Sequence, residues 1–502
     1  MQKIIEKLEM IIGNVQNRFQ IPAIAVGLVG KNQIHYMRGF GRLSINKPQP
    51  IDEHTIFALA SISKSTASAS LAILVEEGRL KWSDPVKKYL PDFSLYDPFV
   101  DREIQVRDLL IHNSGLPPVS GGTIWYDSKF SRKEVVHRLR YLKPVSSFRS
   151  GYAYQNVCYL VAGEIIEAIT GISWDEFIAE RIFNPLGMNR TTTKLDELTK
   201  LKNFASPHKC FNGKVKEIPF RNHENIGAGA AVNSSIYDWS RYVQMLLNNG
   251  SFHGNTVLSP QRINELWAAQ TCIPIEIGPQ ELQKTTQKFS SYGMGWFLRD
   301  YAGQKIVSHS GGLDGMRTQM CILPEINIGF LVFTNLEPGF GLNALFYSFL
   351  DLLTGKELSD WVSTFEKSKQ ESFIKQSNSL AERNRDRALN TKPSSPLDKF
   401  CGEYFDPKVG AITVSQTQNK LRLDFEESNC FHAELTHWHL DTFEILWDDP
   451  YIPNGLLTFI LDKNGMPEQI VLKQPNLLDV DFSELEIYWI GENDRNNRSS
   501  NG

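Results

Sequence analysis

The sequence predicts an α/β domain followed by a small all-β domain. Strand-like runs occur near the start of the chain and again at residues 306–307 and 328–334. Helix-like segments fill most of residues 84–250 between them. Strands at both ends of a region with helices inserted between them indicate a single sheet that distant segments complete.

The first elements are a helix and a hairpin. Apolar residues recur at helical spacing over residues 4–19, which predicts an amphipathic helix. Residues 23–29 and 33–39 are strand-like, and Gly30-Lys31-Asn32 joins them as a tight turn.

Three later helices carry boundary signals. Residues 61–77 are expected to be helical and to end at Gly78, which is suited to a C-cap. Residues 131–134 form a Ser-x-x-Glu capping box that opens another helix. A further helix is expected over residues 155–170, where Gly171 stops it.

The pattern changes beyond about residue 355. Residues 366–387 are dense in charged and amide side chains, and residues 390–396 have the composition of a linker. Residues 421–425 alternate strictly, and Asn464-Gly465 lies between two apolar runs, which predicts a type I′ hairpin turn. Roughly 90 residues of short strands fit a small barrel or sandwich.

The composition is that of a globular protein. Of 502 residues, 41% are apolar and 22% charged, which excludes a disordered or collagen-like chain. The formal net charge of −4 gives no general reason to bind nucleic acid. The six cysteines form no CxxC pair, so a zinc ribbon or thioredoxin-like site is not expected. Charges at the N-terminus argue against a signal peptide, and the apolar run 21–30 is too short to span a bilayer, so a cytoplasmic protein is expected.

A serine three residues before a lysine is the first candidate for chemistry. A serine hydroxyl is a poor nucleophile until a base takes its proton, and a desolvated lysine can serve as that base. On a helix this spacing places both side chains on one face. The spacing occurs four times, at Ser44–Lys47, Ser61–Lys64, Ser206–Lys209 and Ser372–Lys375. Only the second pair, Ser61–Lys64, follows an apolar segment and lies at the start of a predicted helix. An N-capping serine with a solvated lysine remains an alternative.

Five segments in order resemble motifs of the serine β-lactamase and penicillin-binding protein superfamily. They are residues 55–64, residues 108–117, Tyr154-Gln155-Asn156, residues 292–296 and His309-Ser310-Gly311-Gly312. The closest resemblance is to class C β-lactamases, D-alanyl-D-alanine carboxypeptidases and D-aminopeptidases, and it covers about residues 5–350. It implies an antiparallel sheet flanked by helices, with an all-helical subdomain. Residues 404–472 resemble the lipocalin-like barrel attached to some of these hydrolases.

The resemblance implies roles for four side chains. Ser61 would be the nucleophile that forms an acyl-enzyme, and Lys64 its proton partner. Tyr154 would face Lys64 and pass a proton from Ser61 to the leaving group. Asn156 would donate to a substrate amide carbonyl, with helix capping as the alternative.

The His309-Ser310-Gly311-Gly312 element would line the cleft as a strand edge. The backbone N–H groups of Ser61 and Gly312 would form the oxyanion hole, and glycine would let a substrate backbone approach. His309 stands where β-lactamases carry lysine, so efficient antibiotic hydrolysis is not expected. Its imidazole is expected to titrate near pH 6–7 if it lines the cleft, and a structural histidine is the alternative.

The expected function is therefore a serine hydrolase acting on small peptides or amides, of the D-aminopeptidase or carboxypeptidase type. The alternatives are a β-lactamase, a small-ester esterase, or a non-catalytic penicillin-binding or sensing relative. No cofactor and no metal is expected, because nothing completes a ligand set around His432, His437 and His439. The expected partners are a small-molecule or short-peptide substrate and further copies of the chain, bound through the C-terminal domain, with no nucleic acid or membrane.

The expected domains follow from these assignments. They are a hydrolase domain over residues 1–355, a helical or polar linker over 356–395, a β-barrel over 396–490 and a disordered tail over 491–502.

Overall fold

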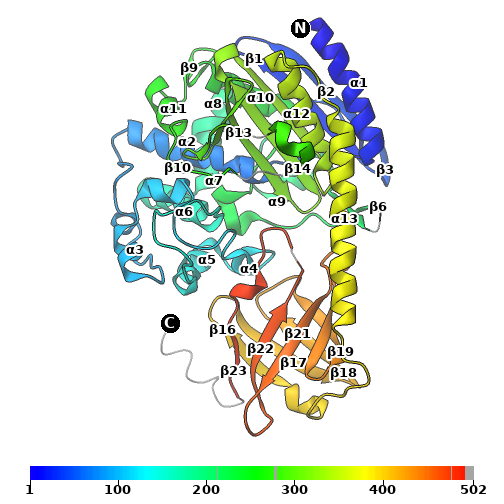
Figure 1. Ribbon diagram of the computed structural model, residues 1–502. Helices are drawn as coiled ribbons and strands as arrows, with labels where there is room; N and C mark the ends of the chain where they lie inside the picture. The colour runs from blue at the N-terminus through cyan, green and yellow to red at the C-terminus, as the bar shows by residue number, and fades with distance from the viewer. Residues whose placement is uncertain (212, 276–279, 286, 476, 492–502) are drawn as a thin grey trace. The chain divides into compact units, whose positions relative to one another are not determined.

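The computed structural model describes the whole chain except residues 212, 276–279, 286, 476 and 492–502 (Figure 1). All but the first residue of the tail expected to be disordered therefore lies outside the described residues. The chain divides into two compact units. The sheet unit comprises Met1–Phe93, Phe99–Gly115 and Val145–Phe373, and the barrel unit comprises Ser94–Pro98, Leu116–Pro144 and Ile374–Gly502.

The sheet unit is built on a nine-stranded antiparallel sheet in the order β10-β11-β12-β13-β14-β15-β1-β2-β3. The strands are β1 Ala23–Gly30, β2 Ile34–Ser44, β3 Lys47–Pro50, β10 Thr271–Cys272, β11 Ser290–Tyr292, β12 Phe297–Tyr301, β13 Gln304–Leu313, β14 Met316–Leu323 and β15 Ile328–Thr334. β1 pairs with β15 from Ile24↔Thr334 to Gly30↔Ile328. The predicted completion of the sheet by distant segments is confirmed.

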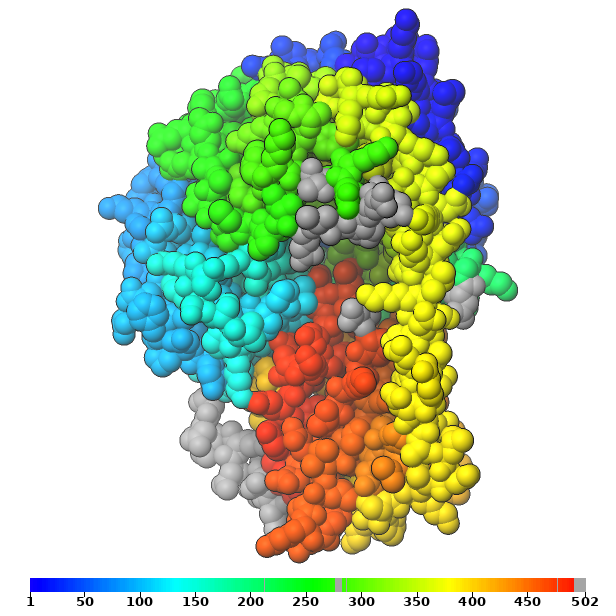
Figure 2. Space-filling model, viewed as in Figure 1, coloured from blue at the N-terminus to red at the C-terminus, as the bar shows by residue number. Residues whose placement is uncertain are grey.

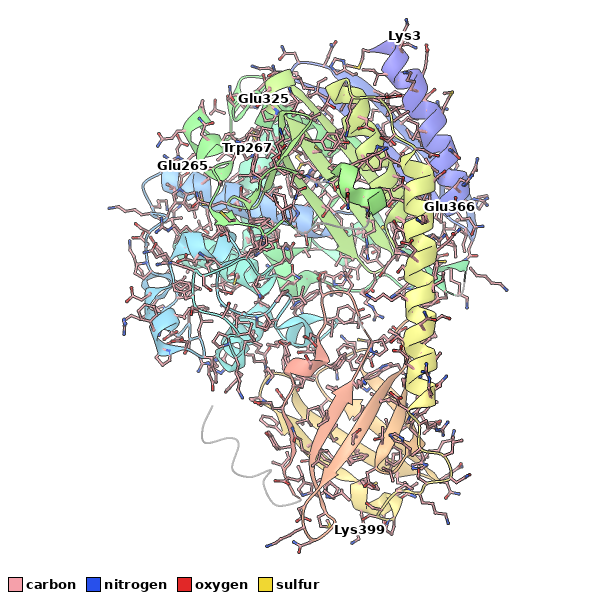
Figure 3. All side chains as sticks on the ribbon, viewed as in Figure 1. Lys3, Glu265, Trp267, Glu325, Glu366 and Lys399 are labelled. Atoms are coloured by element: carbon pink, nitrogen blue, oxygen red, sulfur yellow. The ribbon has the colours of Figure 1, made fainter. Side chains whose placement is uncertain are left out.

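One face of this sheet is covered by α1 (Gln2–Phe19), α12 (Phe340–Thr354) and the first part of α13 (Trp361–Arg385). The buried stripe of α1 packs into the same core as residues from β1, β14 and β15, so its apolar side chains face the sheet. At the surface α1 lies beside the C-terminal part of this unit (Figure 2). There Arg18 forms an ion pair with Glu366, which is labelled on α13 in Figure 3.

Helices α2 (Ser63–Glu76), α6 (Val157–Thr170) and α10 (Ile236–Leu247) belong to the other side of the sheet unit, where α10 packs on β1 and β15. α2 is buried from Ser63 to Leu74, and it packs against α6, α7 (Trp174–Ile178) and α11 (Pro260–Leu266). Its many serines and alanines keep the helix thin, which allows close packing on all sides.

The remaining elements are short. They are β4 Ile56–Ala58, α3 Pro98–Glu103, α4 Gly122–Trp125, α5 Arg132–Arg138, α7 Trp174–Ile178, α8 Asn184–Leu186, α9 Leu195–Lys200, β5 His208–Phe211, β6 Lys214–Glu217, β7 Asn233–Ser235, β8 Ser251–Phe252, β9 Asn255–Thr256 and α11 Pro260–Leu266.

Local sequence signals placed most helix boundaries correctly. The capping box at Ser131 opens α5 with both reciprocal hydrogen bonds, and Gly171 ends α6 in the left-handed conformation. α2 begins at Ser63 rather than at residue 61, because Ser61 lies in a 3₁₀ turn, Ala60–Ile62, that leads into the helix.

The barrel unit contains a closed barrel of eight strands in sequence order. They are β16 Gly402–Asp406, β17 Gly410–Thr417, β18 Lys420–Phe425, β19 His432–His439, β20 Thr442–Trp447, β21 Gly455–Leu461, β22 Pro467–Lys473 and β23 Ile487–Trp489. Aromatic side chains contribute to its core, with ring centroids 4.6 Å apart for Phe400 and Phe459 and 5.6 Å for Phe443 and Phe459.

The type I′ turn predicted at Asn464-Gly465 is wrong. A type I′ turn needs positive φ at both central residues, and of these two only Gly465 has it, at 76°. The connection from β21 to β22 is longer, and the Asp462 carboxylate organises it by accepting from the backbone N–H groups of Asn464 and Met466.

Within the described residues no single helix has both the length and the apolar character needed to cross a bilayer. Val157–Thr170 and Trp174–Leu186, bent by 81° at the break between them, satisfy that test only when they are taken together.

Candidate active site

Ser61 occupies a strand–turn–helix junction. β4 pairs with β7 just before it, and the 3₁₀ turn Ala60–Ile62 then redirects the chain into α2. Ser61 is 8% exposed, whereas Lys64, one turn further along, is fully buried. Ser61 is therefore buried except for a small exposed area, and Lys64 has none.

The ammonium group of Lys64 has an acceptor for each of its three protons. Its Nζ lies 3.1 Å from Ser61 Oγ, 2.7 Å from Asn156 Oδ1 and 2.8 Å from the carbonyl oxygen of Gly229. These contacts offset the desolvation free energy of the buried ammonium group, and they fix its distance to Ser61.

Two tyrosine rings flank the same ammonium group. Nζ lies 4.8 Å from the ring centroid of Tyr154 and 5.3 Å from that of Tyr159, within the range of cation–π attraction. The Tyr159 hydroxyl donates to the carbonyl of Leu110 at 2.6 Å, so that side chain is fixed in place. Tyr154 is half-buried, and its ring faces Lys64 as the sequence predicted.

Asn156 stands at the N-cap of α6, but its side chain makes no capping hydrogen bond. Its amide oxygen instead accepts from Lys64. Helix capping is therefore not what this side chain does in the structure.

His309 on β13 is 1% exposed and hydrogen-bonded on both sides of its ring. Nδ1 lies 2.7 Å from the carbonyl of Ser310, which can only accept, so Nδ1 carries the proton. Nε2, 2.8 Å from the hydroxyl of Tyr292, therefore accepts. Burial, reinforced by the nearby charge of Lys64, lowers the pKa of His309 to about 3. The expectation that it titrates near pH 6–7 is wrong, because the ring is desolvated and lies near a cation.

Neighbouring residues of β13 point to opposite faces of the sheet, as strand geometry requires. The His309 ring lies on the side of Tyr154, with centroids 6.3 Å apart, whereas Ser310 is exposed. Gly311 packs directly on the backbone before Ser61: a Cβ atom there would lie 2.0 Å from the carbonyl oxygen of Leu59. The Thr318 hydroxyl donates to that same oxygen at 3.0 Å. β13, including Gly312, is thus held against the turn that carries Ser61.

His112 orders the chain around Tyr154. It is fully buried, and burial, followed by the charge of Lys64, lowers its pKa well below the usual value. Its Nδ1 accepts from the backbone N–H of Gln155 at 3.0 Å, and its ring centroid is 4.3 Å from that of Tyr154.

Sequence reasoning missed three partners in this cluster: the Gly229 carbonyl, the Tyr292 hydroxyl and the Tyr159 ring. Tyr292 is the first residue of the motif at residues 292–296, so its place in the site could have been predicted from the sequence. Gly229 contributes only a backbone atom, and no residue pattern marks such a role.

The other candidates lie outside the cluster. Lys47 Nζ donates to Ser206 Oγ, so two of the remaining serine–lysine pairs are tied to each other. His432 bonds Asp424 and the Ser428 carbonyl, whereas His437 and His439 bond separate backbone groups. In the part of the chain that the structure describes, no three His, Cys, Asp or Glu side chains form a group that could hold a metal ion.

Comparison with known proteins places the geometry in context. Residues 11–347 match the family described as "Beta-lactamase", and residues 386–488 match a "Domain of unknown function (DUF3471)". The chain is 26% identical to the unguisins hydrolase ungD' of Aspergillus campestris, over 93% of this chain and 89% of that protein. It is 23% identical to penicillin-binding protein 4* of Bacillus subtilis, over 87% and 92% of the two chains.

Two solved structures share the fold. The octameric penicillin-binding protein homologue from Pyrococcus abyssi has a TM-score of 0.63 at 22% identity, covering 96% of this chain and 99% of its own. The D-stereospecific amidohydrolase from Streptomyces sp. has a TM-score of 0.51 at 20% identity, covering 65% and 94%. With a family match that spans most of the sheet unit and all five motifs, this chain belongs to the Beta-lactamase family of the serine β-lactamase and penicillin-binding protein superfamily.

Proposed function

We propose that the protein is a serine hydrolase in which Ser61 forms an acyl-enzyme. The observation that carries this proposal is the 3.1 Å contact between Ser61 Oγ and the buried Nζ of Lys64, at the turn that leads into α2. A serine held by a buried cation, beside a tyrosine whose phenolate that cation stabilises, is an arrangement suited to acyl transfer, because the phenolate can take the serine proton.

The proposed reaction has two steps. In the first, the bond from Ser61 Oγ to the acyl carbon forms and the C–N bond of the amide breaks. The Tyr154 phenolate, stabilised by the charge of Lys64, takes the serine proton and passes it to the leaving nitrogen. In the second, water adds to the acyl carbon, its proton returns through the same groups to Ser61 Oγ, and the acid is released.

The turn at Ser61 and strand β13 supply the proposed oxyanion hole. The backbone N–H groups of Ser61 and Gly312 would donate to the developing oxyanion, and removing one such donor typically costs about 10²–10³ in kcat. The tight packing of Gly311 on Leu59 supports this role, since it fixes the spacing of the two segments.

We propose small peptides and amides, including those with D-residues, as the substrates. A buried neutral imidazole at position 309 offers no charge for the carboxylate of a penicillin, which favours amide hydrolysis over β-lactam hydrolysis. The names of the relatives, a hydrolase and a D-stereospecific amidohydrolase, are consistent with that choice.

A substrate panel tests the proposal. D-alanine and L-alanine p-nitroanilides, nitrocefin and p-nitrophenyl acetate are assayed with the wild type, with Ser61→Ala and with Ser70→Ala, a buried serine of the same helix, as control. We expect turnover of the anilides above that of nitrocefin, lost in Ser61→Ala and retained in Ser70→Ala. Turnover of the ester or nitrocefin alone would make the enzyme an esterase or β-lactamase. No turnover by any variant would favour a binding relative.

We also propose that the chain forms an oligomer through its C-terminal domain, since the Pyrococcus abyssi homologue is described as octameric. Light scattering of the full chain after size-exclusion chromatography tests this. A single species at the chain mass of 57.1 kDa would contradict it.

A further inference from the structure

The end of β13 that carries Gly312 is held by β14. The pairing of β13 with β12 ends at Ser308, whereas its pairing with β14 continues to Leu313. Within this second ladder Gly312 lies opposite Arg317. Directly opposed residues of antiparallel strands project to the same face of the sheet, so the Arg317 side chain extends along the backbone of Gly312.

The two glycines of β13 contact different neighbours. Gly311 packs on the carbonyl of Leu59, on the face of the sheet toward Ser61. Gly312 faces the other way, and a Cβ atom there would lie 3.1 Å from Nη1 and 3.4 Å from Cζ of Arg317. Arg317 therefore packs on the proposed oxyanion donor from the face opposite to the nucleophile turn.

The guanidinium group of Arg317 also holds the turn that follows Gly312. β13 ends at Leu313 and β14 begins at Met316. Nη1 of Arg317 donates to the carbonyl oxygens of both residues, each at 2.8 Å. The Arg317 side chain is 17% exposed, so these bonds are largely shielded from water. One nitrogen atom thus fixes both ends of the turn.

Glu337 holds the guanidinium group in place. Its Oε1 lies 3.1 Å from Nη2 of Arg317, and its Oε2 accepts from the backbone N–H of Gly315 at 3.2 Å. The backbone N–H of Glu337 donates to the carbonyl of His208, whose own N–H donates to the carbonyl of Gly315. One carboxylate therefore contacts both the arginine and the middle of the turn, and its backbone is tied to the same segment.

A planar guanidinium group is suited to these contacts. It carries five N–H donors in a rigid plane, so one edge can bind the two carbonyls while the other nitrogen binds the carboxylate. A lysine ammonium group has its three donors on one atom and has no such geometry. The contacts of Arg317 therefore depend on its shape as well as its charge.

We propose that Arg317, supported by Glu337, is a positioning residue that orients the backbone N–H of Gly312 toward the oxyanion. The inference rests on the proposed function, because it gives Arg317 a role in acyl transfer to Ser61. An oxyanion donor acts where charge develops in the transition state, so displacing it weakens transition-state binding more than substrate binding. Arg317 therefore contributes to kcat rather than to KM.

Steady-state kinetics and a boronic acid test the inference together. D-alanine p-nitroanilide is the substrate, and phenylboronic acid probes the oxyanion site. Ser61 Oγ adds to boron as the serine proton passes to Tyr154, and an oxygen of the tetrahedral adduct then lies where the oxyanion would lie. Arg317→Met should lower kcat by about 10-fold or more and weaken phenylboronic acid binding by a similar factor, while KM changes by less than about 2-fold.

Three further variants separate positioning from general damage. Arg317→Lys keeps the charge next to Glu337 but not the planar geometry, so it should recover part of the lost kcat. Glu337→Gln, which keeps the shape and removes the charge, should lower kcat less than Arg317→Met. Arg241→Met is the matched control, because Arg241 on α10 likewise donates to two backbone carbonyls, those of Leu186 and Gly187, and packs on a glycine. It should leave kcat and phenylboronic acid binding unchanged.

Normal kcat in Arg317→Met would overturn the inference, and so would a lower kcat with unchanged phenylboronic acid binding. Melting curves establish that each variant is folded. If Arg317→Met is not folded, a kcat equal to that of the wild type in both Arg317→Lys and Glu337→Gln would overturn the inference instead.

Failure of the proposed function has a different signature. It would appear as turnover that is absent in the wild type or persists in Ser61→Ala. Hydrogen exchange of residues 309–318, which needs no catalysis, then decides whether Arg317 holds the turn. Exchange about 10-fold faster in Arg317→Met than in the wild type would keep the structural contact and remove only its catalytic role, whereas unchanged exchange would remove both.

Discussion

Gly311 has no room for a side chain, because the carbonyl oxygen of Leu59 lies 2.0 Å from where its Cβ atom would be. Leu59 precedes Ser61 by two residues, so this contact sets the distance between the nucleophile turn and strand β13. The same carbonyl also accepts from Thr318 on β14, which ties the turn to a second strand. The proposed oxyanion hole depends on this contact.

Gly311→Ala should therefore lower kcat by about 10² or more, because the turn and the strand must move apart and one oxyanion donor is displaced. The measurement is kcat together with the melting temperature. Gly13→Ala in α1 is the matched control, since nothing lies within 4 Å of its Cβ position and alanine favours a helix. A Gly311→Ala enzyme with normal kcat would mean that this contact does not position the site.

Lys64 and Tyr154 should behave as one catalytic unit. Lys64→Met and Tyr154→Phe should each lower kcat by about 10²–10⁴, the usual contribution of general acid–base groups. The double variant should be little worse than either single one, since groups that act together are not additive. Tyr159→Phe is the control, because its ring lies at a similar distance from Lys64 while its hydroxyl donates to the Leu110 carbonyl. Additive losses, or normal turnover by Tyr154→Phe, would remove the tyrosine from the proposed mechanism.

His309 should not produce an inflection in kcat/KM between pH 5 and 8, because its pKa is lowered to about 3. It should instead make the fold sensitive to acid. The unfolded chain takes up a proton near pH 6.5 that the folded chain does not, so stability falls as the pH drops from about 6.5 toward 3, by about 1.4 kcal/mol per pH unit.

Melting temperature measured against pH checks this. His309→Asn should make the profile less steep below pH 6.5, where the buried His112 still contributes, and His253→Asn, an exposed histidine, should leave it unchanged. The same slope in His309→Asn and the wild type would show that the ring is protonated in the folded state.

Glu484 should be a main support of residues 116–144 within the barrel unit. Its carboxylate accepts from Ser120 Oγ at 2.9 Å, Thr123 Oγ1 at 2.9 Å and the backbone N–H of Gly121 at 3.1 Å. Burial raises its pKa despite these hydrogen bonds. Leaving their donors unpaired by Glu484→Ala should cost about 3 kcal/mol.

Limited proteolysis measures how firmly residues 116–144 are held. Glu484→Ala should expose residues 116–144 to cleavage, Glu484→Gln should do so less, and Glu468→Ala, an exposed glutamate of β22, should match the wild type. Equal cleavage rates in all four proteins would show that other contacts, such as the backbone bond from Lys129 to Glu427, hold the segment without Glu484.

The sequence predicted those features that depend on local pattern. Helical periodicity, the capping box at Ser131 and the alternation in β18 each reflect physics within one turn or strand, and the structure confirms them. The order of the five motifs was enough to predict the family.

What the sequence did not reveal depends on contacts between distant segments. The pKa of His309 is set by burial and by Lys64, which lies far away in the chain. Residues 116–144 belong to the barrel unit, and Glu484 is one of the residues that hold them there. No local sequence pattern in either segment predicts this contact. Similarly, the Gly229 carbonyl reaches Lys64 only because of how the chain folds around α2.

The central claim is that Ser61 is a nucleophile. Incubation with a fluorophosphonate, followed by intact-mass analysis and peptide mapping, tests it most directly. The account predicts a single adduct on Ser61 that is absent in Ser61→Ala and present in Ser70→Ala. Labelling at another residue, or no labelling by any acylating or phosphonylating reagent, would contradict it.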